Sequence, residues 1–127
     1  RVEGPTGEWF IAARLRLEPG DGEAVRGRIR DLLAQRADTQ PTGTASCGSV
    51  FANPQDDYAG RLIEAAGLKG HRIGGAEVST RHANFILNTG AATAADIEAL
   101  ILHVQRCVQE SFGVRLTPEV RIVGEPA

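Results

Sequence analysis

Ser49 is the side chain of this sequence that is best placed to do chemistry. It follows Gly48 within Thr39–Pro54, a long polar stretch that lies between two helical patterns. So long a connection without regular structure is uncommon in a compact domain unless it is functional or disordered. The apolar pair Val50-Phe51 argues against a solvated linker. We therefore expect the loop to hold a ligand, although a serine that only stabilises a turn remains an open alternative.

A hydrolase is a disfavoured interpretation of the same serine. The nucleophile elbow requires Gly-x-Ser-x-Gly at a turn from strand to helix, whereas an apolar pair follows Ser49 here. No other feature supports a cysteine hydrolase using Cys47. Gly74-Gly75 could let a ligand approach the backbone, but the three spaced glycines of a dinucleotide-binding fingerprint are absent.

The remaining reactive side chains each have a plain structural interpretation. His71 and His82 titrate near neutral pH, yet a histidine beside apolar strands is more often a structural residue. Glu119 precedes a short apolar run and is expected to face solvent. Cys47 and Cys107 are too few and too far apart for a disulfide scaffold or a zinc site. We expect two reduced thiols and no metal.

Apolar spacing predicts the elements that must position these residues. Asp56 or Asp57 is expected to begin the second helix, and Thr93 to begin the third. The predicted helices are Val25–Arg36, Tyr58–Ala66 and a helix from Thr93 to Phe112, and the predicted strands are Trp9–Leu17, a glycine-interrupted strand after Leu68, Phe85–Asn88 and Val120–Val123. This order indicates an α+β fold, with a small, mostly antiparallel sheet and helices packed on one face.

Composition limits the class of protein. The 127 residues, 42% hydrophobic and 24% charged, suffice for one domain. A net charge of -2 provides no basic surface for nucleic acid. The sequence has neither the apolar run needed for membrane insertion nor a secretory signal, so a cytoplasmic location is the default expectation. Because Met is absent, we expect the chain to be a fragment of a larger enzyme.

Three separated motifs together carry a specific resemblance. They are GSVFANP from Gly48, AGRLIEAAGLKGHRIGGAEVSTRHANFILN from Ala59 and LTPEVRIVGE from Leu116. In this order and spacing they closely resemble the C-terminal region of MurB, the UDP-N-acetylenolpyruvoylglucosamine reductase of peptidoglycan synthesis. The resemblance runs from Trp9 to Gly124 and is strongest to the branch that lacks the substrate-binding tyrosine loop.

The resemblance implies a flavoenzyme. NADPH reduces FAD, and the flavin then delivers hydride to UDP-N-acetylglucosamine enolpyruvate, which yields UDP-N-acetylmuramate. It also implies that FAD is bound mainly by an N-terminal region that this chain does not contain. Residues 1–18 would continue a strand from that region, and residues 19–127 would form the substrate-binding domain. The family's catalytic arginine, in a Tyr-Arg-x-Ser motif, would precede Arg1, so the isolated fragment is expected to be inactive.

The resemblance also carries site residues over, position by position. The catalytic serine of the family's Gly-Ser-x-Phe loop falls on Ser49, and the glutamate that opens the last strand falls on Glu119. The implied substrate-binding residues are Asn53, four residues after the serine, Arg36, which would meet the diphosphate, and His82. The alternative is a non-catalytic module that only binds a nucleotide sugar.

The implied chemistry suits a lone serine. Hydride transfer to the terminal carbon leaves a carbanion, or enolate, beside the substrate carboxylate. Such a centre is strongly basic, so an alcohol of ordinary acidity can protonate it without the histidine partner that a nucleophilic serine needs. The developing negative charge requires donors or cations. Glu119 would therefore help only if it were protonated or paired with the arginine, while the flavin supplies the hydride chemistry.

Overall fold

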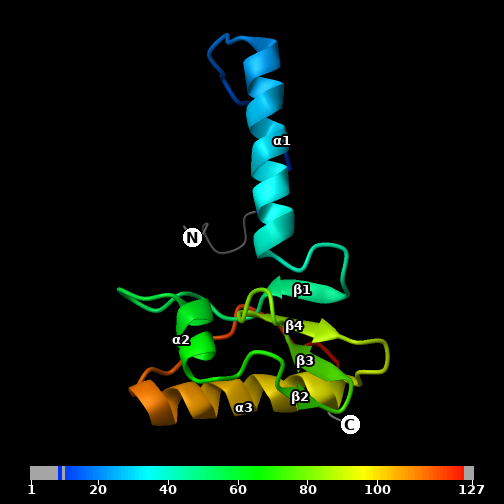
Figure 1. Ribbon diagram of the computed structural model, residues 1–127, viewed down its shortest axis with the longest axis vertical. Coiled ribbons are helices and arrows are strands. Elements are labelled where there is room, and N and C mark those ends of the chain that lie inside the picture. Colours follow the sequence, from blue (N-terminus) through cyan, green and yellow to red (C-terminus); the bar gives the residue numbers. More distant parts are fainter. Residues whose placement is uncertain (1–8, 10, 125–127) are drawn as a thin grey trace.

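A computed structural model describes residue 9 and residues 11–124 of the chain. Its elements are α1 (Gly22–Thr39), β1 (Ser46–Ser49), α2 (Ala59–Ala65), β2 (Arg72–Ile73), β3 (Ala76–Val78), β4 (Phe85–Asn88) and α3 (Ala94–Phe112). The four strands form one sheet in the order β1-β4-β3-β2, and every neighbouring pair is antiparallel. The predicted α+β fold is confirmed, because helices accompany one antiparallel sheet, with α3 running below the strands and α2 to their left in Figure 1.

Helix α3 is the main support of the sheet, and its predicted limits are confirmed. Thr93 begins it with a capping box shared with Asp96, and Gly113 ends it in a left-handed conformation. Its apolar stripe is buried against α2, β2 and β3. The fully buried side chains of this core include Phe51, Leu62, Ile63, Leu100, Val104, Val108 and Leu116. The core therefore lies between the sheet and the pair α2 and α3.

Helix α1 stands apart from this core. Asp21 begins it by accepting a hydrogen bond from the Glu23 N–H, as expected of an N-cap aspartate. The predicted helical spacing is correct, but none of its residues is buried. Figure 1 shows it projecting away from the sheet. A hydrogen bond joins the C-terminal end of α1 to the rest of the domain, where the Arg81 Nη1 donates to the Ala37 carbonyl over 2.9 Å.

Two predicted terminal strands are absent from the described residues. Residues 11–17 form no strand, and Ile11 and Leu17 are exposed, because no neighbouring strand lies beside them to complete a ladder. Residues 120–123 form none either. The tail pairs earlier, through an isolated bridge between Phe51 and Pro118. The Ala52 N–H donates to the Thr117 carbonyl over 2.9 Å, so the partner of this tail is the segment after β1.

The polar stretch expected to lack regular structure contains a strand. Residues 46–49 form β1 and pair with β4, with a bulge between Ser46 and Ser49. A second strand that went unpredicted is β3, which forms a hairpin with β2 across Gly74 and Gly75. Gly74 has a φ of +53°, a conformation that suits glycine in such a turn. Both strands are too short for alternation to reveal them from the sequence.

Candidate functional site

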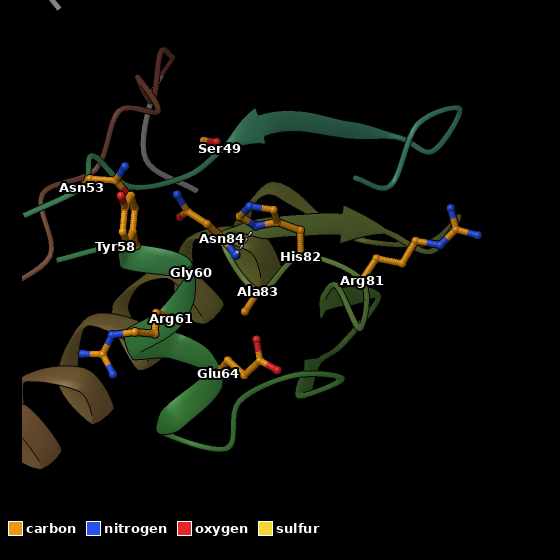
Figure 2. A pocket seen from close by; sticks show the side chains of 10 residues that line it. All are labelled: Ser49, Asn53, Tyr58, Gly60, Arg61, Glu64, Arg81, His82, Ala83 and Asn84. Carbon is orange, nitrogen blue, oxygen red and sulfur yellow. Dashed lines mark hydrogen bonds between the residues drawn. The ribbon is translucent and has the colours of Figure 1, made fainter. Parts of the chain in front are cut away.

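One hollow gathers three of the five sequence-predicted site residues. It has a volume of about 440 Å³ and lies where the end of β1, the start of α2 and the loop before β4 meet. Figure 2 shows Ser49 above His82 and Asn84, with Asn53 and Tyr58 at one side. The lining residues are Ser49, Asn53, Tyr58, Gly60, Arg61, Glu64, Arg81, His82, Ala83 and Asn84. We treat this hollow, called the Ser49 pocket below, as the candidate site.

The bulge in β1 determines how Ser49 is presented. Ser46 pairs with Leu87 and Ser49 pairs with Phe85. An advance of three residues along β1 therefore corresponds to two residues along β4. Gly48 takes a φ of +89° inside this irregular stretch. A bulge adds one residue and changes the direction of the side chains that follow it. Ser49 is exposed and lines the pocket, whereas the next residue, Val50, is buried.

His82 is held in a defined orientation by its neighbours. Its backbone N–H donates to the Oγ of Ser79, which is 1% exposed. Its ring Nδ1 accepts a hydrogen bond from the Asn84 N–H over 3.2 Å, so Nδ1 carries no proton and the neutral ring has its proton on Nε2. Gly60 leaves room for the ring, since a Cβ there would lie 3.0 Å from the His82 Cε1. The Phe85 ring lies edge-on to the His82 ring, with the two ring centres 5.0 Å apart.

Asn53 serves the pocket and the start of α2 together. Its side-chain oxygen accepts the Ala59 N–H over 3.1 Å. This corrects the expectation that Asp56 or Asp57 begins the helix, because Asp57 accepts the N–H of Tyr58, before the first helical residue. Asn53 itself is exposed and lines the hollow. It therefore belongs both to the helix cap and to the candidate site.

Two of the charged residues that line the pocket are paired with neighbours. Arg61 bonds both oxygens of Asp57, and its Nε lies 2.6 Å from Oδ1. That side-chain bond, followed by the Tyr58 N–H, lowers the pKa of Asp57 to about 2. Glu64 accepts from the Lys69 Nζ over 2.7 Å. Arg81 points away from the other lining residues in Figure 2, toward α1.

Glu119 and Arg36 do not line the Ser49 pocket. The Glu119 N–H donates to the Val50 carbonyl over 2.8 Å, so its backbone lies beside the residue that follows Ser49. Arg36 lies near the end of α1 and lines a separate hollow with Cys47 and Gly48. Its Nε donates to the Gln40 side chain over 3.2 Å. The functional roles of both residues stay predictions.

His71, the other histidine singled out from the sequence, lies on a different part of the domain. Its ring stacks on that of His103, with ring centres 4.4 Å apart. Arg106 lies 3.3 Å from the His103 Nδ1, and the Cys107 Sγ lies 3.5 Å from its Nε2. Because arginine can only donate, the Nδ1 of His103 is the acceptor. His71 is thus a packing residue between the β2 loop and α3.

Because of this histidine pair, we expect the stability of the folded domain to depend on pH. The pKa of His103 is lowered from its ordinary value, first by burial and then by the positive charges of His71 and Arg106. In the unfolded chain, His103 therefore takes up a proton at a higher pH than it does in the folded domain. The free energy of unfolding falls as the pH drops from about 6.5 through the lower pKa of the folded state. Thermal unfolding of His103→Gln should depend less on pH across that window. An unchanged pH slope relative to the parent chain would contradict the assignment.

Two classes of feature are missing from the described part of the chain. No group of three or more His, Cys, Asp or Glu side chains within residues 9 and 11–124 is arranged to hold a metal ion. No described helix is long and apolar enough to cross a membrane. The N-termini of the two long helices do not fit a cofactor diphosphate, since Asp21 and the Thr93–Asp96 capping box occupy them. These two helix ends are therefore not diphosphate-binding sites.

Comparison with known proteins decides the family. A family model described as the UDP-N-acetylenolpyruvoylglucosamine reductase C-terminal domain matches residues 40–123. The chain belongs to this family. The match to the MurB C-terminal domain begins just after α1, which buries none of its residues. The predicted division at residues 18 and 19 stays a prediction.

Named relatives agree with this family. The UDP-N-acetylenolpyruvoylglucosamine reductase of Methylococcus capsulatus is 65% identical over 124 residues, which cover 98% of this chain and 41% of that protein. The Alkalilimnicola ehrlichii protein of the same name is 64% identical over 98% of the chain and 42% of its own length. The chain thus spans about two fifths of the length of these relatives.

A solved structure supports the fold of the MurB C-terminal domain. The crystal structure of UDP-N-acetylenolpyruvylglucosamine reductase (MurB) from Thermus caldophilus matches with a TM-score of 0.66 and 37% sequence identity. The match covers 85% of this chain and 38% of that one.

Several lining residues of this MurB domain were not anticipated from the sequence. Tyr58, Arg61 and Glu64 belong to the start of α2, and nothing in their spacing marks them as pocket residues. Asn84 did leave a signal, because it is a polar residue directly before the apolar run of β4. Its 4% exposure confirms that an amide is buried there.

Proposed function

We propose that this chain is the substrate-binding and proton-donating domain of a reductase that converts UDP-N-acetylglucosamine enolpyruvate to UDP-N-acetylmuramate. One observation supports the proposal above the others. Ser49, Asn53 and His82 are separated in the sequence and line one hollow within a MurB C-terminal domain. The relatives carry the name of this reductase, and the hollow is of a size that holds part of a small ligand.

FAD, reduced by NADPH and held by the rest of the longer protein, would supply the hydride. The residues of this chain would act on the other carbon of the double bond. The exposed hydroxyl of Ser49 donates a proton to the carbanion that hydride addition leaves next to the carboxylate. The Nε2–H of His82 and the amide of Asn53 are hydrogen-bond donors available to the substrate.

Glu119 would act beside this proton donor. Its backbone hydrogen bond to Val50 keeps it near the residue that follows Ser49. A carboxylate there would repel the enolate unless a cation or a proton offsets its charge. The proposal therefore requires that Glu119 be protonated or paired with a cation when substrate is bound.

A chimera tests the proposed function. In this chimeric reductase, the present chain replaces the matching segment of the Methylococcus capsulatus protein. We expect the chimera to oxidise NADPH only when UDP-N-acetylglucosamine enolpyruvate is present, at a rate comparable with the parent protein. The isolated chain is the control and should be colourless and inactive. A chimera that folds and carries flavin, yet never reduces the substrate, would contradict the proposal.

A further inference from the structure

Asn84 makes an unusual set of contacts with the segment that follows Ser49. Its side chain is buried, with a residue exposure of 4%. Its Oδ1 accepts the Phe51 N–H over 3.0 Å, and its Nδ2 donates to the Phe51 carbonyl over 2.8 Å. One amide side chain thus satisfies both backbone groups of one residue, as a neighbouring strand would do.

The backbone of Asn84 extends these contacts in two directions. Its carbonyl accepts the Val50 N–H over 2.9 Å. Its N–H donates to the Nδ1 of His82 over 3.2 Å. A single residue therefore contacts the two positions after Ser49 and also the ring of His82.

The fold explains why such a contact is needed. The register of β1 with β4 ends at Ser49 and Phe85, directly after the bulge. Beyond that point β1 has no regular ladder with β4 to hold Val50 and Phe51. On the other side, Val50 accepts the Glu119 N–H over 2.8 Å. The Asn84 amide and the Glu119 segment together hold Val50 and Phe51 from both sides, which restricts where the Ser49 hydroxyl can lie.

We propose that Asn84 is a positioning residue for proton donation, because it fixes the backbone that presents Ser49 and the ring of His82 together. The inference rests on the proposed function of Ser49. It depends on the side chain being an amide, which both donates and accepts. A carboxylate at the same place can accept the Phe51 N–H but repels the Phe51 carbonyl, and only its protonated form regains a donor.

The test is the pH profile of Asn84→Asp in the chimeric reductase. At pH 8 we expect kcat to fall by up to about 100-fold, since a displacement of about 1 Å can cost a catalytic group that much. Activity should return between about pH 7 and pH 5 as the buried carboxyl takes up a proton. KM should change less than kcat, because the substrate-binding groups remain.

Asn88→Asp is the matched control, at the far end of β4 from Asn84. The Oδ1 of Asn88 accepts hydrogen bonds from the N–H groups of Gly90 and Ala92. A carboxylate oxygen can accept the same two bonds. Its pH profile should follow that of the parent chimera. Assays run well below the melting temperature of each variant separate loss of positioning from loss of folding. A profile of Asn84→Asp that matches the control would overturn the inference.

A second measurement does not depend on activity. In this chain, NMR hydrogen exchange should give lower protection factors for the Val50 and Phe51 amides in Asn84→Asp at pH 7.5, with recovery near pH 5. Unchanged protection at these two amides would also overturn the inference. An inactive parent chimera would count against the proposed function. The protection factors of the Val50 and Phe51 amides would still decide whether Asn84 holds this pair in place.

Discussion

Replacing Ser49 by Ala in the chimeric reductase should lower kcat for UDP-N-acetylglucosamine enolpyruvate by about 10²- to 10⁴-fold, the range lost when a positioned proton donor is removed. The reason is that the exposed Ser49 hydroxyl is the proton donor that we propose for the carbanion. Reduction of the flavin by NADPH should keep its rate, because that half-reaction does not use the serine. Stopped-flow measurement of the two half-reactions checks both expectations.

Ser46→Ala is the control for this substitution. Ser46 lies on the same strand and is also exposed, but it lines the hollow of Arg36 rather than the Ser49 pocket. Its turnover should match that of the parent chimera. If Ser49→Ala also turned over normally, the serine would not be the proton donor, and a domain that only binds the nucleotide sugar would become the better interpretation. A loss of flavin reduction in the variant would point to damage outside the proposed step.

Gly75→Ala should destabilise the domain by about 3 kcal/mol or more, because overpacking against rigid backbone cannot be relieved by a side-chain movement. A Cβ at this position would lie closer than 3.0 Å to backbone atoms of Ala91 and Ala92, which lead into α3. Gly75 also accepts the N–H and hydroxyl of Thr89. For a domain of this size the melting midpoint should fall by roughly 12 to 24 °C, as circular dichroism would measure.

Gly27→Ala is the matched change in open space. A Cβ at Gly27 would meet nothing within 4 Å, and α1 buries no residue. Alanine favours a helix interior by about 1 kcal/mol over glycine, so α1 should gain helicity while the midpoint of the sheet unit stays the same. If Gly75→Ala also left that midpoint unchanged, Gly75 would not lie as close to the backbone of Ala91 and Ala92 as the structure indicates.

The elements predicted correctly are those whose signals are local. For α3, Thr93 and Gly113 mark the two ends, and the apolar stripe between them has a helical period. For β4, a continuous apolar run indicated a strand inside the sheet, and β4 does lie between β1 and β3. In each case the information sits within a few residues, where propensity and capping act directly.

The elements predicted wrongly depend on a distant partner. Residues 11–17 and 120–123 alternate or carry apolar side chains as strands do, yet among the described residues they join no ladder. Strand β1 was missed for the opposite reason, since its residues Ser46–Ser49 are polar and its pairing with β4 supplies the structure. Strand formation depends on cross-strand contacts, which spacing along one segment does not reveal.

The site divides in the same way. Residue types singled out Ser49, and the order of three motifs carried the resemblance that implied Asn53, His82 and the class of reaction. Their common hollow arises from contacts made across the fold: the β1 bulge, the room left by Gly60, and the Asn84 amide that holds Phe51. Arg36 lies in another hollow because α1 projects from the sheet. Chemical character is a local property of a side chain, whereas proximity depends on packing between segments far apart in the chain.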